Sequence, residues 1–312
     1  MKPFAFVFPG QGSQSVGMLD AWGAHPAVLA TLEEASAALG EDVGRLIREG
    51  PKEALDLTTN TQPVMLTAGI ACYRAWLAEG GPEPAAVAGH SLGEYTALVA
   101  AGALTLADAL PLVRLRAQAM QQAVPVGVGA MAAILGLDAA AVGEGCAKAA
   151  AETGEVVEAA NFNDPKQTVI AGTKAGVDKA CEILKAMGAK RALPLAVSAP
   201  FHSSLMKPAA EVLRVRLAQV PLAAPRIAVV HNIDASVQTE ADAIRDALVR
   251  QAFGAVRWVE VVQALRGRGL AHILECGPGK VLAGLVKRID AECASLTVLD
   301  PASLAEGRAL VA

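Results

Sequence analysis

The chain has 312 residues and a formal net charge of −4, with 53% hydrophobic and 19% charged residues, which is the composition of a compact globular protein. The acidic balance argues against a nucleic-acid-binding protein, because that class normally carries a basic face or arm. No apolar run reaches the roughly 18 residues of a membrane helix, and the start of the chain lacks the core of a signal peptide, so we expect a cytoplasmic protein that meets no membrane.

The first part of the chain predicts an α/β pattern in which two turns follow strands. The elements expected in chain order are a strand at 4–8, a glycine-rich turn at 10–14, helices at 26–39 and 62–79, an apolar run at 84–88 leading into a turn at 89–93, and helices at 94–103 and 105–122. Proteins of the α/β class place their sites at the carboxyl ends of strands. The two turns are therefore the first candidates for functional loops.

From residue 126 the pattern changes to a self-contained order of strands and helices. We expect strands at 128–135, 155–161, 168–172 and 190–197 and helices at 138–151 and 174–187, followed by helices near 203–218, 240–252 and 258–267 and strands at 227–230 and 272–275. The order βαββαβ is that of a ferredoxin-like unit. The interpretation is a large α/β-hydrolase-like domain with a parallel sheet, residues 1–125 and 198–312, interrupted by a small ferredoxin-like domain, residues 126–197.

The cysteines indicate neither a disulfide framework nor a metal site. They are odd in number, widely spaced and form no C-x-x-C pair: Cys72, Cys146, Cys181, Cys276 and Cys293. We expect reduced and mostly buried thiols, and no bound metal.

The segment Gly89-His90-Ser91-Leu92-Gly93 fits the pattern G-x-S-x-G. Small residues on both sides of the serine let the chain make a sharp strand-to-helix turn that exposes the hydroxyl. The apolar run before this segment and the amphipathic helix after it favour a nucleophilic Ser91. The alternative is an ordinary strand-to-helix turn with a capping serine.

A serine nucleophile needs a base, and five histidines are available: His25, His90, His202, His231 and His272. His25 starts a surface helix, and His90 adjoins the serine and is expected to point away from it across the turn. His231 and His272 lie at the ends of buried strands, where a core histidine is the commoner explanation. His202 lies where the small domain rejoins the large one, so its position makes it a candidate base without excluding the others.

Six segments carry a resemblance to a known family. They are Gly10-Gln11-Gly12-Ser13-Gln14, Gly89-His90-Ser91-Leu92-Gly93-Glu94, Arg116 with its apolar surroundings, Asn161-Phe162-Asn163 before Val169-Ile170-Ala171-Gly172, Pro200-Phe201-His202-Ser203, and Glu275-Cys276-Gly277-Pro278-Gly279. In this order they resemble the malonyl-CoA:acyl carrier protein transacylases of bacterial fatty acid synthesis, over nearly the whole chain. Ala117 and Cys276 depart from the residues frequent in that family, and neither is a reacting group.

The resemblance implies which residues take part in the reaction and what each of them does. Ser91 would attack the thioester, and His202 would accept its proton and return it to the departing coenzyme A thiolate. The family orients this histidine through a main-chain carbonyl, which falls at Gln251 here, and not through a carboxylate. Backbone N–H groups of Gln11 and Leu92 would form the oxyanion hole.

The resemblance also implies how the acyl group is selected. Arg114 and Arg116 fall on different faces of their helix, so one of them is expected to point inward, and an inward Arg116 would hold the free malonyl carboxylate through two parallel hydrogen bonds. In related acyltransferases a bulky Phe before the histidine and an aliphatic residue after the serine accompany malonyl, as Phe201 and Leu92 do here. Asn161 is a further candidate for the pocket.

The expected function is malonyl transfer from malonyl-CoA to the phosphopantetheine thiol of acyl carrier protein through a malonyl-serine intermediate, in a ping-pong reaction that supplies fatty acid elongation. We expect no cofactor, acyl carrier protein as partner and a monomer. One alternative is a malonyl transferase that serves malonate decarboxylase. A serine esterase or thioesterase would favour a later Asp or Glu to complete a triad and has no use for Arg116. A non-catalytic carrier-binding module is disfavoured by the intact Ser91, His202 and Gln11.

Overall fold

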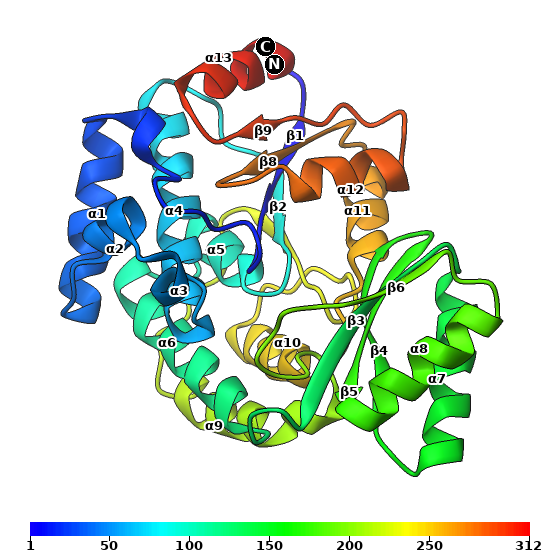
Figure 1. The fold of residues 1–312 in the computed structure, drawn as a ribbon. Helices are drawn as coiled ribbons and strands as arrows, with labels where there is room; N and C mark the ends of the chain where they lie inside the picture. The colour runs from blue at the N-terminus through cyan, green and yellow to red at the C-terminus, as the bar shows by residue number, and fades with distance from the viewer.

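The computed structural model describes residues 1–312 and contains two separate sheets, each with its own helices (Figure 1). The larger sheet has the strand order β7-β2-β1-β8-β9, and all of its pairings are parallel. Its strands are β1 (Phe4–Phe8), β2 (Ala86–Gly89), β7 (Ala228–Val230), β8 (His272–Cys276) and β9 (Thr297–Val298). The first and last residues of the chain lie side by side, since the N–H of Lys2 donates to the carbonyl of Val311.

Helices cover both faces of the parallel sheet, which explains why β1 is apolar at every position and fully buried. Phe4, Phe6 and Phe8 point to one face and join the main hydrophobic core, while Ala5 and Val7 point to the other. The helices of this part are α1 (Pro26–Leu39), α2 (Val43–Glu49), α3 (Lys52–Leu55), α4 (Thr58–Ala78), α5 (Gly93–Ala100), α6 (Leu106–Gln122), α9 (Lys207–Leu217), α10 (Ala241–Phe253), α11 (Trp258–Gly267), α12 (Val281–Ile289) and α13 (Pro301–Val311). The second face is covered by α11 and α12 through Trp258, Val261, Leu282 and Leu285.

The smaller sheet is antiparallel, with the strand order β4-β5-β3-β6. Its elements in chain order are β3 (Gly129–Leu135), α7 (Ala139–Thr153), β4 (Val157–Asp164), β5 (Gln167–Thr173), α8 (Lys174–Ala186) and β6 (Arg191–Pro194). Ala132 and Ile134 face α7 and α8, whereas Met131 and Ala133 face the other way and pack with Phe201. The period-two alternation of β3 therefore gives the small sheet one face for its own helices and one for the large part.

Strand β4 joins the small sheet to the large part. The N–H of Phe162 donates to the carbonyl of Val256 and the N–H of Val256 to the carbonyl of Ala160, both at 2.9 Å, beside an irregularity in the β4 register. Asp164 Oδ2 accepts from Arg288 Nε of α12 at 2.7 Å. These contacts fix the end of β4, which carries candidate pocket residues, against the large part.

The predicted mixed α/β class, with a parallel sheet and a separate antiparallel sheet, is confirmed; the domain boundaries stay a prediction. Several elements differ in extent: α5 ends at Ala100 and not at 103, and β4 covers Val157–Asp164 and not 155–161. Helix α4 starts at Thr58 and not at 62, so Pro63 lies inside the helix and does not mark its start. Strand β6 ends at Pro194 and not at 197, because the chain turns after the N–H of Leu195 has donated to the carbonyl of Met131: the N–H of Val197 donates back to the carbonyl of Leu195. Helices α2, α3, α12 and α13 and strand β9 were not predicted. None of the helices combines the length and the apolar character that crossing a membrane requires.

Candidate active site

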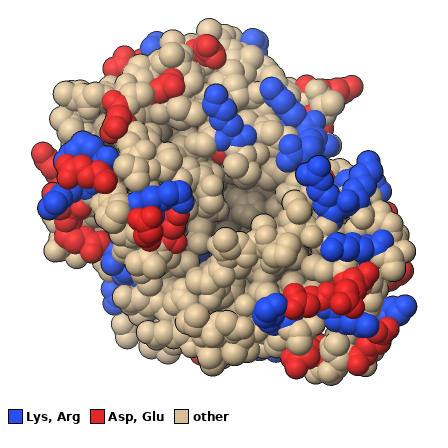
Figure 2. Space-filling model, in the orientation of Figure 1, with Lys and Arg blue, Asp and Glu red and all other residues tan.

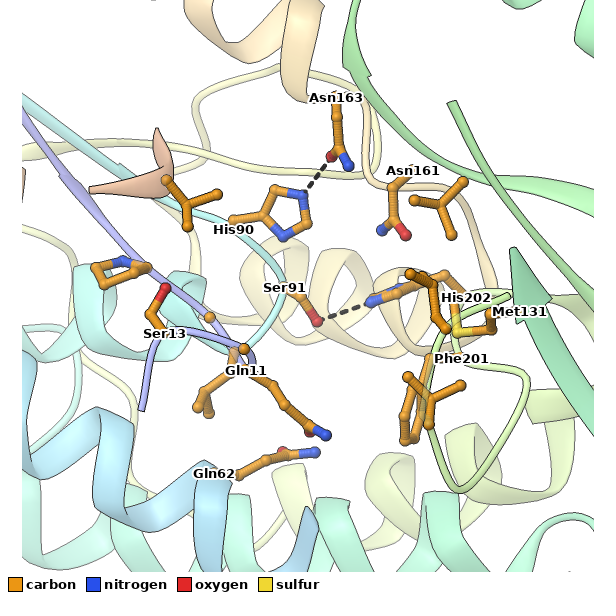
Figure 3. Close-up of a pocket in the computed structure, with 18 of the residues that line it drawn as sticks. Gln11, Ser13, Gln62, His90, Ser91, Met131, Asn161, Asn163, Phe201 and His202 are labelled. Atoms are coloured by element: carbon orange, nitrogen blue, oxygen red, sulfur yellow. Dashed lines mark hydrogen bonds between the residues drawn. The ribbon is translucent and has the colours of Figure 1, made fainter. Parts of the chain in front are cut away.

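Ser91 lies in a tight turn between β2 and α5 and has a φ of +53°, in the left-handed region that non-glycine residues rarely adopt. The flanking glycines are required by close packing. A Cβ on Gly89 would lie 1.9 Å from the carbonyl carbon of Gly93, and one on Gly93 would lie 2.1 Å from the carbonyl oxygen of Phe8. The G-x-S-x-G spacing thus permits a tight turn, and this turn points the Ser91 hydroxyl into the cavity (Figure 3).

His202 lies opposite Ser91, in the loop from β6 to α9, and also has a left-handed φ, +61°. Its Nε2 is 2.7 Å from Ser91 Oγ (Figure 3). Its Nδ1 is 2.9 Å from the main-chain oxygen of Gln251. Burial first, and then the nearby Arg116, lower the pKa of His202 to about 3. The neutral ring donates its Nδ1–H to the Gln251 carbonyl, which leaves Nε2 free to accept the serine proton.

Arg116 points inward from α6 and is only 1% exposed. Its Nη2 donates to Ser91 Oγ at 3.2 Å and to Gln251 Oε1 at 3.0 Å, and its Nη1 donates to Gln62 Oε1 at 2.8 Å. Its Nε, also buried, has no acceptor, and burial lowers the pKa of the guanidinium. No carboxylate is bonded to this cation, whereas Arg114 on the same helix pairs with Glu41. Of the two arginines, the structure places Arg116 at the serine.

Two backbone loops meet beside the serine. The loop after β1 carries Gln11, and a Cβ on Gly10 would lie 2.6 Å from the carbonyl oxygen of His90, so only glycine permits the approach. Neither the N–H of Gln11 nor the N–H of Leu92 donates to an acceptor within the chain. Two free N–H groups beside a hydroxyl can stabilise an oxyanion that forms there.

The cavity in front of Ser91 has a volume of about 310 Å³ and opens at the hollow seen in Figure 2. Both parts of the protein line it: Gln11, Gln62, Ser91, Leu92 and Arg116 come from the large part, Met131, Asn161, Asn163 and Val169 come from the small sheet, and Phe201 and His202 come from the connecting loop. All the sequence-predicted site residues except Gln251 line this cavity. Gln251 lies behind it, fully buried, in contact with His202 and Arg116.

Several residues of the site were missed. His90 is not bonded to Ser91, as expected, but it lines the cavity, where its Nε2 pairs with Asn163 Oδ1 at 2.8 Å across to the small sheet. Burial lowers the pKa of His90. Gln62 and Asn232 carried no signal in the sequence. Glu94 carried one, because it is a charged residue inside an apolar helix, but the sequence assigned it no role.

The arrangement has the parts of a serine-dependent acyl-transfer site: a hydroxyl bonded to a neutral imidazole, two free N–H groups and a buried cation at the serine. The base lacks the carboxylate of a hydrolase triad, since its partner is the carbonyl of Gln251. A weaker base suits a thiol as acceptor, because a thiol ionises more readily than water.

Comparisons with known proteins agree with this class. The model of the acyl transferase domain family matches residues 5–298. The malonyl CoA-acyl carrier protein transacylase of Escherichia coli (strain K12) is 53% identical over 306 residues, 98% of each chain. A crystal structure of an acyl-carrier-protein S-malonyltransferase from Burkholderia pseudomallei 1710b is 66% identical, with a TM-score of 0.97, and the match covers 98% of this chain and 99% of that one. A malonyl-transacylase solved in complex with a type II PKS acyl-carrier protein is 48% identical, with a TM-score of 0.96 and 99% of each chain covered.

Fold, site and family model together define an acyltransferase enzyme. The chain belongs to the acyl transferase domain family and, within it, to the malonyl CoA-acyl carrier protein transacylases. The resemblance stated from the sequence is confirmed.

Proposed function

We propose that this protein transfers a malonyl group from malonyl-CoA to the phosphopantetheine thiol of acyl carrier protein, for fatty acid elongation, with Ser91 as the nucleophile and His202 as the base. In the first half-reaction Ser91 Oγ attacks the thioester carbonyl while His202 Nε2 takes the hydroxyl proton. The N–H groups of Gln11 and Leu92 stabilise the oxyanion. The C–S bond then breaks, and His202 returns the proton to the coenzyme A sulfur.

The second half-reaction reverses these roles. The carrier thiol gives its proton to His202 Nε2 and attacks the malonyl-serine carbonyl, and Ser91 Oγ leaves and takes the proton back. The carbonyl of Gln251 holds the tautomer throughout by accepting the Nδ1–H of His202 at 2.9 Å. No cofactor takes part in either half-reaction, because the two thioesters are close in energy and only a proton is shuttled.

The observation that carries the choice of acyl group is the buried Arg116 cation, 3.2 Å from Ser91 Oγ and bonded to no carboxylate. A buried cation is costly without a counter-charge, and a substrate carboxylate would supply it. Phe201 and Leu92 narrow the cavity beside it and fit malonyl better than a branched acyl group, and Asn161, 6% exposed in β4, adds a polar group to the wall.

The relatives support this function over the alternatives. The relative from Escherichia coli is named for transfer to acyl carrier protein, and the other transacylase was solved in complex with an acyl-carrier protein. A malonate decarboxylase partner is therefore not favoured. A hydrolase is not favoured either, since Gln251 and not a carboxylate orients the base.

We further propose that the acidic carrier docks on basic side chains beside the cavity. Figure 2 shows Lys and Arg gathered along one side of the hollow, where α12 and the small sheet lie in Figure 1. The candidates are Lys190, Arg191, Lys280, Lys287 and Arg288, all exposed. Arg288 pairs with Asp164, while the other four make no ion pair within the chain, so Lys190, Arg191, Lys280 and Lys287 have charge to offer a partner.

We place the reaction in the cytoplasm. All five cysteines are free, and four of them are buried, as suits a reducing compartment in which thiol substrates stay reduced.

Mass spectrometry of the protein mixed with malonyl-CoA, without the carrier, tests the proposal. We expect a malonyl adduct on the peptide that contains Ser91, and its loss when the phosphopantetheinylated carrier is added. Ser91→Ala should abolish the adduct. Ser13, the other hydroxyl that lines the cavity, provides the control, and Ser13→Ala should retain the adduct. An adduct that persists on Ser91→Ala, or one released as fast by water as by the carrier, would contradict the proposal.

A further inference from the structure

A fully buried polar cluster lies directly behind Ser91 and His202, and none of its side chains takes part in the steps of the transfer reaction. At its centre is Glu94, in the first turn of α5, with 0% exposure. Its Oε1 is 2.8 Å from His231 Nδ1, and its Oε2 accepts from the N–H of Asn232 and from Nε2 of Gln251, each at 2.9 Å. A carboxylate with three donors in the protein interior is satisfied as an anion.

Glu94 determines which way the amide of Gln251 points. A carboxylate can only accept, so Gln251 must turn its NH₂ group toward Glu94 and its Oε1 toward the opposite side. On that side Oε1 accepts from Arg116 Nη2 at 3.0 Å. A reversed amide would bring its NH₂ against the guanidinium, donor against donor. The orientation that Glu94 imposes is therefore the one that holds Arg116 beside Ser91.

The same cluster grips the strained backbone of Ser91. Gln251 Nε2 donates to the Ser91 carbonyl at 2.9 Å, and the Ser91 N–H donates to Asn232 Oδ1 at 2.7 Å. Asn232 also donates its Nδ2 to the Gly89 carbonyl at 2.7 Å. Glu94 holds both residues in place: it accepts from the side-chain amide of Gln251 and from the main-chain N–H of Asn232. A non-glycine residue keeps a strained positive φ only where the surrounding contacts hold its backbone in place. These hydrogen bonds hold the backbone of Ser91.

We propose that Glu94 is a positioning residue for malonyl transfer: through Gln251 and Asn232 its buried carboxylate sets both the serine turn and the place of the Arg116 guanidinium. This positioning role rests on the proposed function, in which Arg116 binds the malonyl carboxylate. Glu94 then supports acyl selection as well as rate. A carboxylate that only stabilised the fold would support both donors, malonyl-CoA and acetyl-CoA, equally.

The ratio of kcat/KM for malonyl-CoA to kcat/KM for acetyl-CoA separates the two roles. Glu94→Ala frees the amide of Gln251 and loosens Arg116, so we expect malonyl transfer to fall about 100-fold and the ratio to fall roughly ten-fold, as misplacement of a positioned group does. Glu94→Gln should recover the wild-type ratio to within about three-fold. Its amide oxygen can face Asn232 and Gln251 while its NH₂ meets His231 Nδ1, whose ring then carries its proton on Nε2, an atom with no partner in the structure.

Two further variants keep the test decisive if Glu94→Ala does not fold. Gln251→Met removes the amide but keeps the main-chain carbonyl that orients His202, and it should lower the ratio as Glu94→Ala does. Leu265→Ala removes a fully buried side chain of α11 outside the cluster, and it should lower the melting temperature while leaving the ratio unchanged.

Equal losses for both donors in Glu94→Ala, or a wild-type ratio in Gln251→Met, would overturn the positioning role. A Glu94→Gln variant as impaired as Glu94→Ala would also overturn it, because the charge and not the orientation of the amides would then matter. The proposed function fails by a different result, the absence of a malonyl adduct on wild-type Ser91.

Discussion

The two sheets of this protein contribute to one cavity in different ways. The large parallel-sheet part holds Ser91 in a left-handed turn and fixes Arg116, whose guanidinium donates to the buried amide oxygens of Gln62 and Gln251. The small antiparallel part contributes a wall, Met131 and Val169, that follows from strand alternation alone, and the exposed Lys190 beside it. The first set is buried and held by hydrogen bonds. The second is mainly apolar lining and surface charge, with Asn161 and Asn163 as its polar groups in the cavity.

This difference predicts which substitutions should change the rate of transfer and which should change the affinity for the carrier. Groups that change their bonds must be held within a fraction of an ångström, so substitutions in the large part should act on the chemical steps. Apolar lining and exposed charges act mostly on encounter and fit, so substitutions on the small part and on α12 should act on KM for the carrier. The predictions below test that division, beginning with the largest effect.

Replacing the base should cost the most. His202→Ala leaves the Ser91 hydroxyl without an acceptor for its proton, and we expect the rate of Ser91 acylation by malonyl-CoA to fall about 10²- to 10⁴-fold, measured in single-turnover experiments. KM for the carrier should change little. If His202→Ala were mild and His231→Ala severe, the base would be misassigned.

Replacing Arg116 should act on one donor only. Arg116→Ala removes a charge-assisted, two-pronged contact in a nearly dry cavity, and a loss of about 2 to 5 kcal/mol predicts that malonyl transfer falls roughly 30-fold or more. Acetyl transfer should hold steady or rise, since acetyl-CoA has no carboxylate to leave unpaired. Arg116→Lys should rescue only partly. Arg114→Ala, on the same helix but paired with Glu41 outside the cavity, is the control. Equal losses with both donors would make Arg116 structural.

The pH dependence should show the depressed pKa of His202, about 3. The profile of kcat/KM for malonyl-CoA should lack an inflection near 6.5, the ordinary histidine value. Arg116→Ala should move the acid limb of this profile to higher pH, because Arg116 is, after burial, the second cause of the lowered pKa of His202. Between pH 6.5 and 3 the unfolded chain binds a proton at this histidine that the folded chain refuses, so the contribution of His202 to the free energy of unfolding falls as the pH drops through this range. An inflection at 6.5 in the wild type would contradict the neutral, buried base.

Charge reversal on the carrier side should give the smallest effect. Arg191→Glu together with Lys287→Glu should raise KM for the carrier roughly three- to ten-fold with kcat unchanged, because exposed charge contacts are individually weak. The effect should shrink as salt is added. Lys148→Glu, exposed on α7 away from the cavity, is the matched control. A fall in kcat with unchanged KM would break the division between the two parts.

The sequence predicts the local features of the site and misses the long-range ones. The Ser91 turn is predicted because its cause, small residues at 89 and 93, lies within five positions. His202 is favoured only by its place between domains, since its contact with Ser91 spans 111 residues and no local pattern encodes it. The contact between Glu94 and Gln251 spans 157 residues and is invisible for the same reason. The short helices α2 and α3 are missed because tertiary packing stabilises segments of this length. Helix α12 has a clear apolar face, Leu282, Leu285 and Val286, and was predictable from its sequence.

The backbone strain at the two reacting residues bears on how related chains change when they lose the reaction. Ser91 and His202 both have positive φ, at +53° and +61°, where a side chain costs about 1 to 2 kcal/mol that glycine would not. Selection for catalysis keeps both side chains in place against this strain. Where a descendant lost the transfer reaction, glycine at either position would be favoured at once, since it relaxes the backbone. Paired glycines at these two positions would therefore mark a related chain that has lost the transfer reaction.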